Sequence, residues 1–187
     1  MTTFQMKDLF AYLAVPGPDL LLRDYGRCAF PLLEQHLNQV PLGRALVLDF
    51  KGVSVMDTSF ADEAVLELVL KLIAGEYGDR FLILGEPSPA TVENLEGTIA
   101  RRRVKAAILA RGEGRLGIIG DVEPNMVDAW QKTKRSGTLT ARQLADELGL
   151  EINAASMRLL KLHKLRLLAR EEELSAAGRQ HVYRFPQ

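Results

Sequence analysis

The sequence has 187 residues but only one cysteine, Cys28, and three histidines, His36, His163 and His181. A single cysteine cannot form a disulfide within the chain, so nothing favours a secreted, disulfide-stabilised protein. The histidines are scattered, and Cys28 and His36 lack the spacing of a metal site. We therefore expect no metal and no cofactor.

Long apolar stretches are also absent. No apolar run has the length needed to cross a membrane, and the N-terminus lacks the charged and apolar regions of a signal peptide. Hydrophobic residues make up 47% of the chain and charged residues 26%, which is an ordinary balance for a folded protein. These properties predict a soluble, cytoplasmic protein that does not contact membranes.

The formal net charge is zero, but the charge is divided unevenly along the chain. Residues 1–121 contain 13 basic and 16 acidic residues, whereas residues 122–187 contain 11 basic and 8 acidic ones. The C-terminal third is thus the more basic part, which permits contact with nucleic acid without requiring it. Pro124 suits the first turn of a helix, so we place a domain boundary between residues 121 and 122.

The stretch from Ala45 to Gly78 organises the first domain. Ala45 to Phe50 is a short apolar run that predicts a strand buried on both faces. Phe60 to about Tyr77 predicts an apolar helix with one polar stripe. Its members are four residues apart, Glu63, Glu67 and Lys71, and the last two are in the favourable order for a helical ion pair.

Other strands and helices alternate with these two. We expect strands at Leu20–Leu22 and Phe81–Leu84, helices at Tyr25–Gln39 and Thr91–Lys105, and a terminal β-hairpin over 106–119. The order predicts an α/β domain with a mixed, mostly parallel sheet. Arg101, Arg102 and Arg103 are interpreted as a solvated helix end, with anion or partner binding as the alternative.

The loop before the second helix is the candidate functional site of this domain. Asp57, Thr58 and Ser59 precede the helix, and one of them should cap it by accepting hydrogen bonds from its first free amides. Capping alone is one interpretation of these residues, and regulation at the loop is the other.

The segment VLDFKGVSVMDTSF resembles the strand, loop and helix start of STAS domains, the fold of the anti-sigma-factor antagonists. The resemblance covers roughly residues 18–110, and residues 59–63 are similar to the less characterised STAS-like relatives. It implies that Asp57 is the turn's aspartate and that Ser59 is a regulatory serine. A partner of the histidine-kinase-like ATPase class would phosphorylate this serine. Thr58 and Phe60 replace the Ser and Gly of the family's turn.

The second domain has a clear local pattern. Thr140 should cap a helix that runs to Leu148, Gly149 allows a tight turn, and Asn153 should cap a second helix. Over residues 125–185 the chain resembles the winged helix-turn-helix of bacterial transcriptional regulators, an α+β fold. The wing would have strands at 167–170 and 181–185 and a loop at 171–179.

This second resemblance implies DNA binding through the second helix and the wing. The residues expected to face DNA are Asn153, Ala154, Met157, Arg158 and Lys161, with backbone contacts from Lys164, Arg179 and Arg184. Winged-helix domains that bind DNA usually do so as dimers. The function expected is a bacterial-type transcriptional regulator controlled by its STAS-like domain.

The alternative is an adaptor that acts only through protein contacts. Met157 and Leu160 are apolar, and Glu171 to Glu173 would repel phosphate. Leu70, beside the polar stripe of the first domain, is its candidate partner surface. An enzyme is not expected, because no base is placed to activate Ser59.

Overall fold

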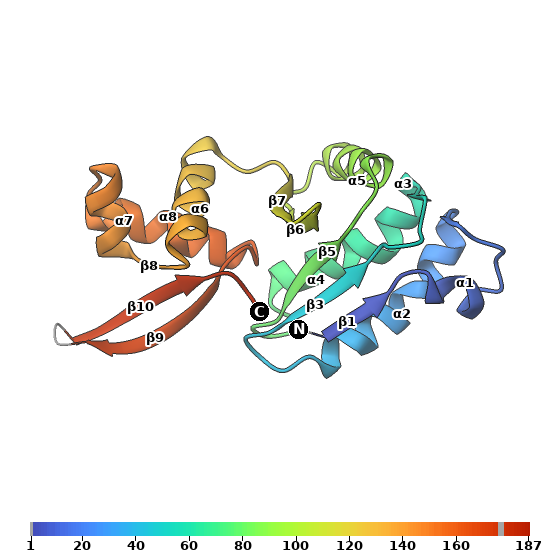
Figure 1. Ribbon diagram of the computed structural model, residues 1–187, viewed down its shortest axis with the longest axis horizontal. Coiled ribbons are helices and arrows are strands. Elements are labelled where there is room, and N and C mark those ends of the chain that lie inside the picture. Colours follow the sequence, from blue (N-terminus) through green and yellow to red (C-terminus); the bar gives the residue numbers. More distant parts are fainter. Residues whose placement is uncertain (1, 176–177) are drawn as a thin grey trace. The chain divides into compact units, whose positions relative to one another are not determined.

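The computed structural model describes residues 2–175 and 178–187, apart from the side chain of Ser175. The chain separates into two compact units, Met1–Asp121 (unit 1) and Val122–Gln187 (unit 2). Both units combine helices with strands, and the protein is of mixed α/β class (Figure 1).

Unit 1 contains a five-stranded sheet in the order β1-β3-β5-β6-β7. Its strands are β1 (Thr2–Gln5), β3 (Ala45–Asp49), β5 (Phe81–Gly85), β6 (Ala107–Gly112) and β7 (Arg115–Gly120). The first four are parallel to their neighbours, and β7 returns antiparallel to β6. The hairpin expected at the end of this unit is therefore present, and its first strand also completes the parallel sheet.

The central strands are built from continuous apolar runs. Every residue of β5 is buried, and β5 lies between β3 and β6. A strand whose side chains are buried on both sides of the sheet is expected to be apolar throughout rather than alternating. Ala45 pairs with Phe81 and Leu48 with Leu84 in this register.

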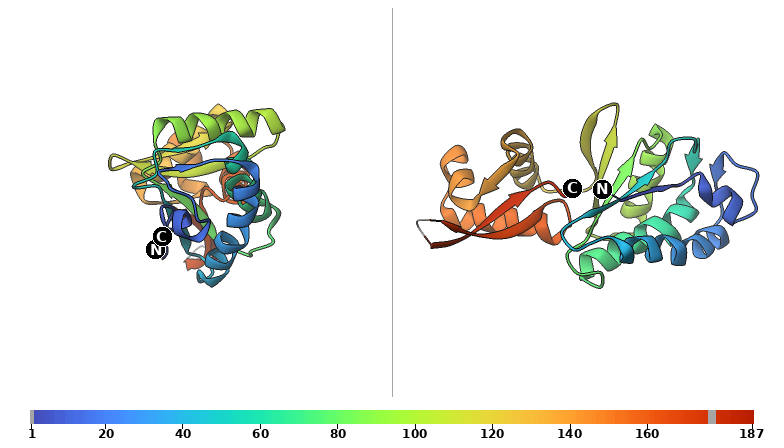
Figure 2. Two further views of the ribbon diagram at one scale, coloured as in Figure 1. Left: turned by 90° about the vertical axis from the view of Figure 1, so that its right-hand side faces the viewer. Right: turned by 60° about the horizontal axis from the view of Figure 1, so that its bottom comes forward.

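The helices of unit 1 pack on one face of this sheet. They are α2 (Arg23–Gln39), the consecutive α3 (Thr58–Phe60), η1 (Ala61–Leu66) and α4 (Glu67–Ala74), and α5 (Pro89–Arg102). In the right-hand view of Figure 2, α2 and α4 run side by side along the sheet. Leu33, Leu68 and Leu95 join Leu48 and Leu84 of the sheet in one hydrophobic core.

The helix expected over residues 60–77 differs in two ways from a regular α-helix. Residues Ala61–Leu66 form a π-helix, in which the Glu67 N–H donates to the Asp62 carbonyl five residues back. The helix ends earlier than predicted, at Ala74, where Gly75 adopts a left-handed φ of 88°. The π-turn changes which residues share a face, so a regular helical wheel does not hold across it.

Several short elements of unit 1 were not expected from the sequence. Strand β1 and helix α1 (Asp8–Tyr12) precede the predicted elements, and β4 (Val55–Met56) lies inside the predicted loop. The strand predicted at Leu20–Leu22 is shorter, β2 (Asp19–Leu20), and pairs in parallel with β4. Helix α2 begins at Arg23, two residues before the predicted start at Tyr25, and contains Pro31 in its interior.

Unit 2 consists of three helices and a three-stranded sheet. The elements are α6 (Pro124–Ser136), β8 (Thr138–Thr140), α7 (Ala141–Leu148), α8 (Ile152–Lys164), β9 (Ala169–Ser175) and β10 (Gly178–Arg184). The sheet is antiparallel in the order β8-β10-β9, and β8 was not predicted. Trp130 of α6 is buried and meets the Phe185 ring edge-on at 5.4 Å, which anchors the helix to the chain end.

Candidate functional site

Asp57 fixes the start of the α3–η1–α4 segment. Its Oδ1 accepts a hydrogen bond from the Phe60 N–H at 2.7 Å, and its Oδ2 accepts one from the Leu22 N–H at 3.1 Å. The prediction that a residue of this loop caps the helix is confirmed, and the residue is Asp57. The second bond ties the helix start to the N-terminal end of α2.

Polar side chains of α5 brace the same loop. Thr91 Oγ1 accepts from the buried Met56 N–H at 3.0 Å, and Asn94 donates to the Met56 carbonyl at 2.9 Å. Thr98 Oγ1 lies 3.3 Å from the Thr58 carbonyl and donates to it. The loop backbone is therefore held by side chains of α5, in addition to the hydrogen bonds of the Asp57 carboxylate.

The three candidate residues differ in their surroundings. Asp57, Thr58 and Ser59 are all half-buried, while the neighbouring Phe60 is fully buried in the core. Both carboxylate oxygens of Asp57 are used, whereas within the described residues the Ser59 hydroxyl has no hydrogen-bond partner. Among the described residues the Thr58 hydroxyl also has no hydrogen-bond partner, so Thr58 and Ser59 both differ from Asp57 in having an uncommitted polar side chain.

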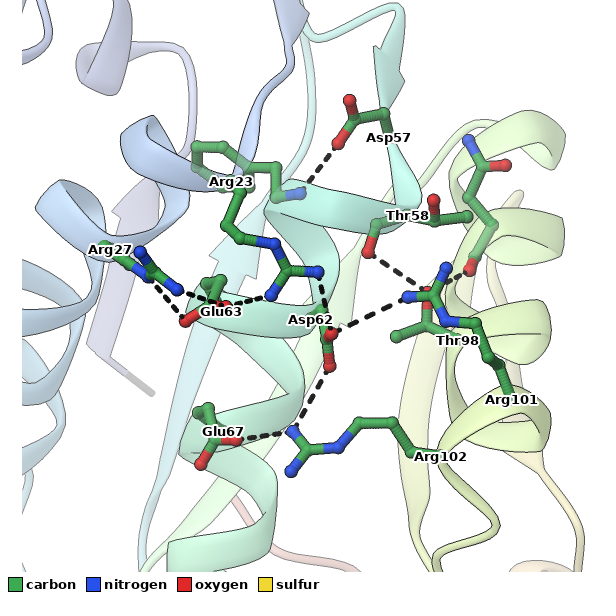
Figure 3. Close-up of polar contacts among 12 residues, drawn as sticks. Arg23, Arg27, Asp57, Thr58, Asp62, Glu63, Glu67, Thr98, Arg101 and Arg102 are labelled. Atoms are coloured by element: carbon green, nitrogen blue, oxygen red, sulfur yellow. Dashed lines mark hydrogen bonds and ion pairs between the residues drawn. The ribbon is translucent and has the colours of Figure 1, made fainter.

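A cluster of four arginines and three carboxylates lies next to this loop (Figure 3). Asp62, on the π-helix, is 9% exposed and meets three guanidinium groups. Arg102 lies 3.2 Å away, Arg23 3.5 Å and Arg101 3.6 Å. Burying a carboxylate is costly unless it is paired, and here α2 and α5 both supply the pairing charge.

Close helix packing brings the arginines of α2 to this cluster. A Cβ on Gly26 would lie 3.0 Å from the Phe60 carbonyl oxygen and 3.1 Å from the Glu63 Cβ. Only a residue without a side chain allows α2 to approach η1 this closely. Arg23 and Arg27, one helical turn apart, then both reach Glu63.

The residues of the polar stripe predicted on the second helix form ion pairs with other helices rather than with each other. Glu67 pairs with Arg102 of α5, and Lys71 pairs with Glu34 of α2 at 3.1 Å. The predicted ion pair between Glu67 and Lys71 is wrong, because each residue finds a partner on a neighbouring helix. Likewise Arg101 and Arg102 are not simply a solvated helix end, since both meet Asp62.

The carboxylates of Glu34 and Glu63 are stabilised in their charged forms. The hydrogen bond from the Tyr77 hydroxyl, 2.5 Å away, is the main cause that lowers the pKa of Glu34 below 4.5; burial opposes it and Lys71 adds to it. Burial raises the pKa of Glu63, but hydrogen bonds from Arg27 and Arg23 outweigh it, so the net pKa is lowered. Burial and Glu34 together raise the pKa of Tyr77 well above its ordinary value.

The lowered pKa values predict that unit 1 loses stability in acid. A group whose pKa is lower in the folded state adds stability above its unfolded pKa and loses it as the pH falls through the folded pKa. Glu63→Gln should therefore cost about 1 kcal/mol at pH 7 and nothing once the pH is well below 4. Urea unfolding at both pH values measures this. Glu93→Gln, at an exposed position of α5, serves as the control.

Leu70 does not stand apart from the fold. The residue is partly buried and packs against the hydrophobic core of unit 1. A polar substitution there would disturb folding as well as any partner contact. Leu70 is consequently a poor probe of the adaptor alternative.

The two helices of the second candidate site are positioned by local signals. Thr140 caps α7 through a capping box with Gln143, as its N-cap position predicted. Gly149 follows with a φ of 63°, and Leu159 and Leu162 of α8 are buried. The predicted side-chain cap by Asn153 is wrong: α8 begins at Ile152, its N-cap is Glu151, and no side chain caps it.

The outer face of α8 carries the residues predicted to face DNA. Asn153, Ala154, Met157, Lys161 and Lys164 are exposed, and Arg158 is half-buried. Two of the cations also contact the start of α6: the Arg158 guanidinium lies 3.5 Å from the Asn125 carbonyl, and Lys161 lies 3.7 Å from Glu123. Both contacts are at the limit of an ion pair or hydrogen bond and would yield to a phosphate.

The wing differs from its prediction. Glu171, Glu172 and Glu173 lie within strand β9 rather than in a loop. Arg184 of β10 pairs with Glu171, and Arg179 pairs with Glu172 at 3.3 Å. The predicted backbone-contacting arginines of the wing are thus already matched by carboxylates on the neighbouring strand.

A cleft of about 280 Å³ lies between α7, α8 and the wing. Arg142, Arg179 and His181 contribute basic groups to its lining, together with Thr140 at the start of α7. Arg142 and His181 were not among the predicted site residues. The position of Arg142 just after the cap could have indicated it, but only the strand register places His181 opposite Glu172.

Within residues 2–175 and 178–187, no group of three His, Cys, Asp or Glu side chains could hold a metal ion. Among the helices in these residues, none is long and apolar enough to span a membrane. His163 is half-buried, with Nδ1 3.0 Å from the Leu168 carbonyl oxygen. No protein-family model and no curated protein matches this chain.

Proposed function

We propose that the protein is a bacterial-type transcriptional regulator, in which unit 2 binds DNA and unit 1 receives a signal from a protein partner. The observation that carries the proposal is the element order of unit 2. A capped helix, a glycine turn, a second helix with an exposed outer face and a two-stranded hairpin follow one another. Winged helix-turn-helix domains place such a second helix in the major groove and their hairpin near phosphates.

The charges around the cleft of unit 2 support a phosphate contact. Arg142 and Arg179 face a cleft that also receives the N-terminal end of α7, where free amides carry partial positive charge. His181 lines the same cleft. Together they would add to the contacts expected from Lys164 and Arg184.

Unit 1 would act as the receiver through the Ser59 loop. The sequence resemblance to STAS domains, the uncommitted Ser59 hydroxyl and the braced backbone around it support this role. A phosphate there would add about −1.5 to −2 charges beside Asp57 and alter the contact with a kinase-like partner. The Phe60 side chain is buried in the core and therefore does not cover Ser59.

The alternative, an adaptor that binds no DNA, rests on the apolar surface of unit 2. Ile152 is 48% exposed, Met157 54% and Leu174 85%. Exposed apolar side chains of this size are typical of protein contact surfaces. The pairing of Arg179 and Arg184 with wing glutamates also fits an adaptor.

Salt dependence of binding to random-sequence duplex DNA tests the proposal. Arg158→Ala/Lys161→Ala is expected to weaken binding about tenfold at low salt and to reduce the slope of log affinity against log salt by about 1.8. Fluorescence anisotropy with a labelled duplex between 50 and 300 mM salt gives both quantities.

The matched control is Lys105→Ala/Arg115→Ala, which removes the same charge from exposed positions of unit 1. It should leave affinity within about twofold of the wild type. Binding that is no tighter at low salt than at high salt would count against DNA recognition and favour the adaptor.

A further inference from the structure

An apolar groove opens beside the Asp57 cap in unit 1. Its volume is about 370 Å³, and it is lined by the segment from Leu13 to Tyr25 with Phe60. Phe60 and Leu20 are fully buried and form its base, whereas Leu22 and Tyr25 are exposed. Asp57, Thr58 and Ser59 do not line the groove, but the neighbouring Phe60 does.

Large apolar side chains are exposed at and next to the lining of the groove in sequence. Tyr12 is 55% exposed, Leu21 40%, Leu22 59% and Tyr25 36%, all within fourteen residues of sequence. Small-molecule sites enclose most of their ligand, whereas protein contact surfaces combine a pocket with a surrounding apolar patch. Tyrosine and leucine around an anchor pocket are what a polypeptide partner would cover.

The backbone holds Leu22 outward in an unfavourable conformation. Leu22 has φ 73° and ψ 138°, a region that residues with a bulky side chain rarely adopt. The Asp57 Oδ2 accepts the Leu22 N–H and maintains this geometry. Strain that exposes an apolar side chain has no benefit for folding, and such strain is concentrated at binding sites.

The charges at the groove are acidic. The Asp19 carboxylate lines it and has no hydrogen-bond or ion-pair partner among the described residues. Asp24, next to Tyr25, has a side chain that is 91% exposed. Arg27 lies 3.7 Å from Asp24, whereas Arg23 is engaged by Asp62 and Glu63 and does not neutralise Asp19.

We propose that this groove docks a protein segment that carries a large apolar anchor residue flanked by lysine or arginine. The anchor would fill the space above Phe60 between Leu22 and Tyr25, and the basic residue would pair with Asp19. The inference deepens the proposed role of unit 1 as the receiver of a partner and rests on that role, but it does not require unit 2 to bind DNA.

The coupling to the Ser59 loop follows from shared contacts. Asp57 bonds both the groove's rim at Leu22 and the helix start at Phe60, and the Phe60 ring forms the floor. A segment that contacts Phe60 and displaces Leu22 would directly affect the two hydrogen bonds that the Asp57 carboxylate accepts. Partner binding in the groove and modification of Ser59 are therefore expected to affect each other.

Selection from random 12-residue peptides displayed on phage tests the proposal on the full-length protein. After depletion against a Leu22→Ser/Tyr25→Ser variant, the enriched peptides should share a large apolar residue next to lysine or arginine. The best synthetic peptide should bind Leu22→Ser at least tenfold more weakly than the wild type. Leu42→Ser, at a leucine that is 65% exposed and outside the groove, should bind it normally.

Substituting Asp19, together with the basic residue of the peptide, tests the proposed ion pair without changing the apolar lining of the groove. Asp19→Asn should weaken the basic peptide about two- to fivefold and leave unchanged a peptide whose lysine is replaced by norleucine. Acidic or anchor-free consensus peptides, or peptides that bind wild type and Leu22→Ser equally, would overturn the groove assignment. Salt-dependent DNA binding by the same protein would then show that the role of unit 2 survives that failure.

Discussion

Replacing Asp62 with alanine is expected to lower the free energy of unfolding of unit 1 by about 2–3 kcal/mol. The Asp62 side chain is 12% exposed and meets Arg102, Arg23 and Arg101 at 3.2, 3.5 and 3.6 Å. Removing one partner of a buried ion pair costs about 3–5 kcal/mol, because the remaining charges stay desolvated and repel each other. The arginines are 34–51% exposed, which reduces the expected loss.

Added salt should lower the free energy of unfolding of the wild type and raise that of Asp62→Ala. In the wild type, salt screens attraction within the cluster, whereas in Asp62→Ala it screens repulsion among four arginines that are left with Asp24, Glu63 and Glu67 as partners. The difference in stability should therefore shrink between 0.05 and 1 M NaCl. Urea unfolding followed by circular dichroism measures it at both concentrations.

Asp24→Ala is the matched control for this prediction. Asp24 is also near the cluster and lies 3.7 Å from Arg27, but its side chain is 91% exposed. Its removal should cost less than about 1 kcal/mol. Equal losses in the two variants would mean that Asp62 is only a surface carboxylate. Partial recovery in Asp62→Ala/Arg101→Ala would identify repulsion between arginines as the cause.

Local sequence signals were enough to predict the regular elements of the fold. The apolar run at Ala45–Phe50, the cap at Thr140 and the hairpin around Gly112–Gly114 each act within a few residues, and each appears where expected. Strand β1 and helix α1 were missed because neither is long enough to show a period. Strand β1 exists through its parallel pairing with β3, which no local pattern reveals.

The candidate site of unit 1 could be predicted only in its local part. The Asp57 cap follows from its position before an apolar helix. The arginine cluster does not, because Asp62 is about 40 residues from Arg23 and from Arg102, and only the packing of three helices brings them together. In addition, Asp62 and Glu67 are five residues apart and both contact Arg102, a spacing that a 3.6-residue period does not predict but a π-helix allows.

The hairpin of unit 2 would itself restrain the proposed binding of DNA. Arg184 and Arg179 are matched by Glu171 and Glu172 across the hairpin, and Glu173 adds a third carboxylate without a partner among the described residues. If DNA phosphates approach the hairpin, these carboxylates weaken their binding in two ways. They repel phosphate directly, and they occupy the arginines that would otherwise contact it.

Neutralising the three glutamates should therefore tighten DNA binding more than any loss of net charge elsewhere. Glu171→Gln/Glu172→Gln/Glu173→Gln is expected to raise affinity for random-sequence duplex DNA about thirtyfold near 0.1 M salt. Release of two arginines onto phosphates should also steepen the salt slope by about 1.8. Anisotropy titrations over a salt series give both values.

The mechanism can be separated into its two parts by single substitutions. Glu172→Gln releases Arg179 and should increase both affinity and salt slope, whereas Glu173→Gln removes only repulsion and should increase affinity with little change in slope. The control Glu93→Gln/Glu96→Gln/Glu113→Gln makes the same change in charge on exposed positions of unit 1. If that control tightened binding equally, net charge alone would explain the effect. If neither triple variant bound DNA, the glutamates would belong to a protein-contacting surface, and the adaptor would be the better account of unit 2.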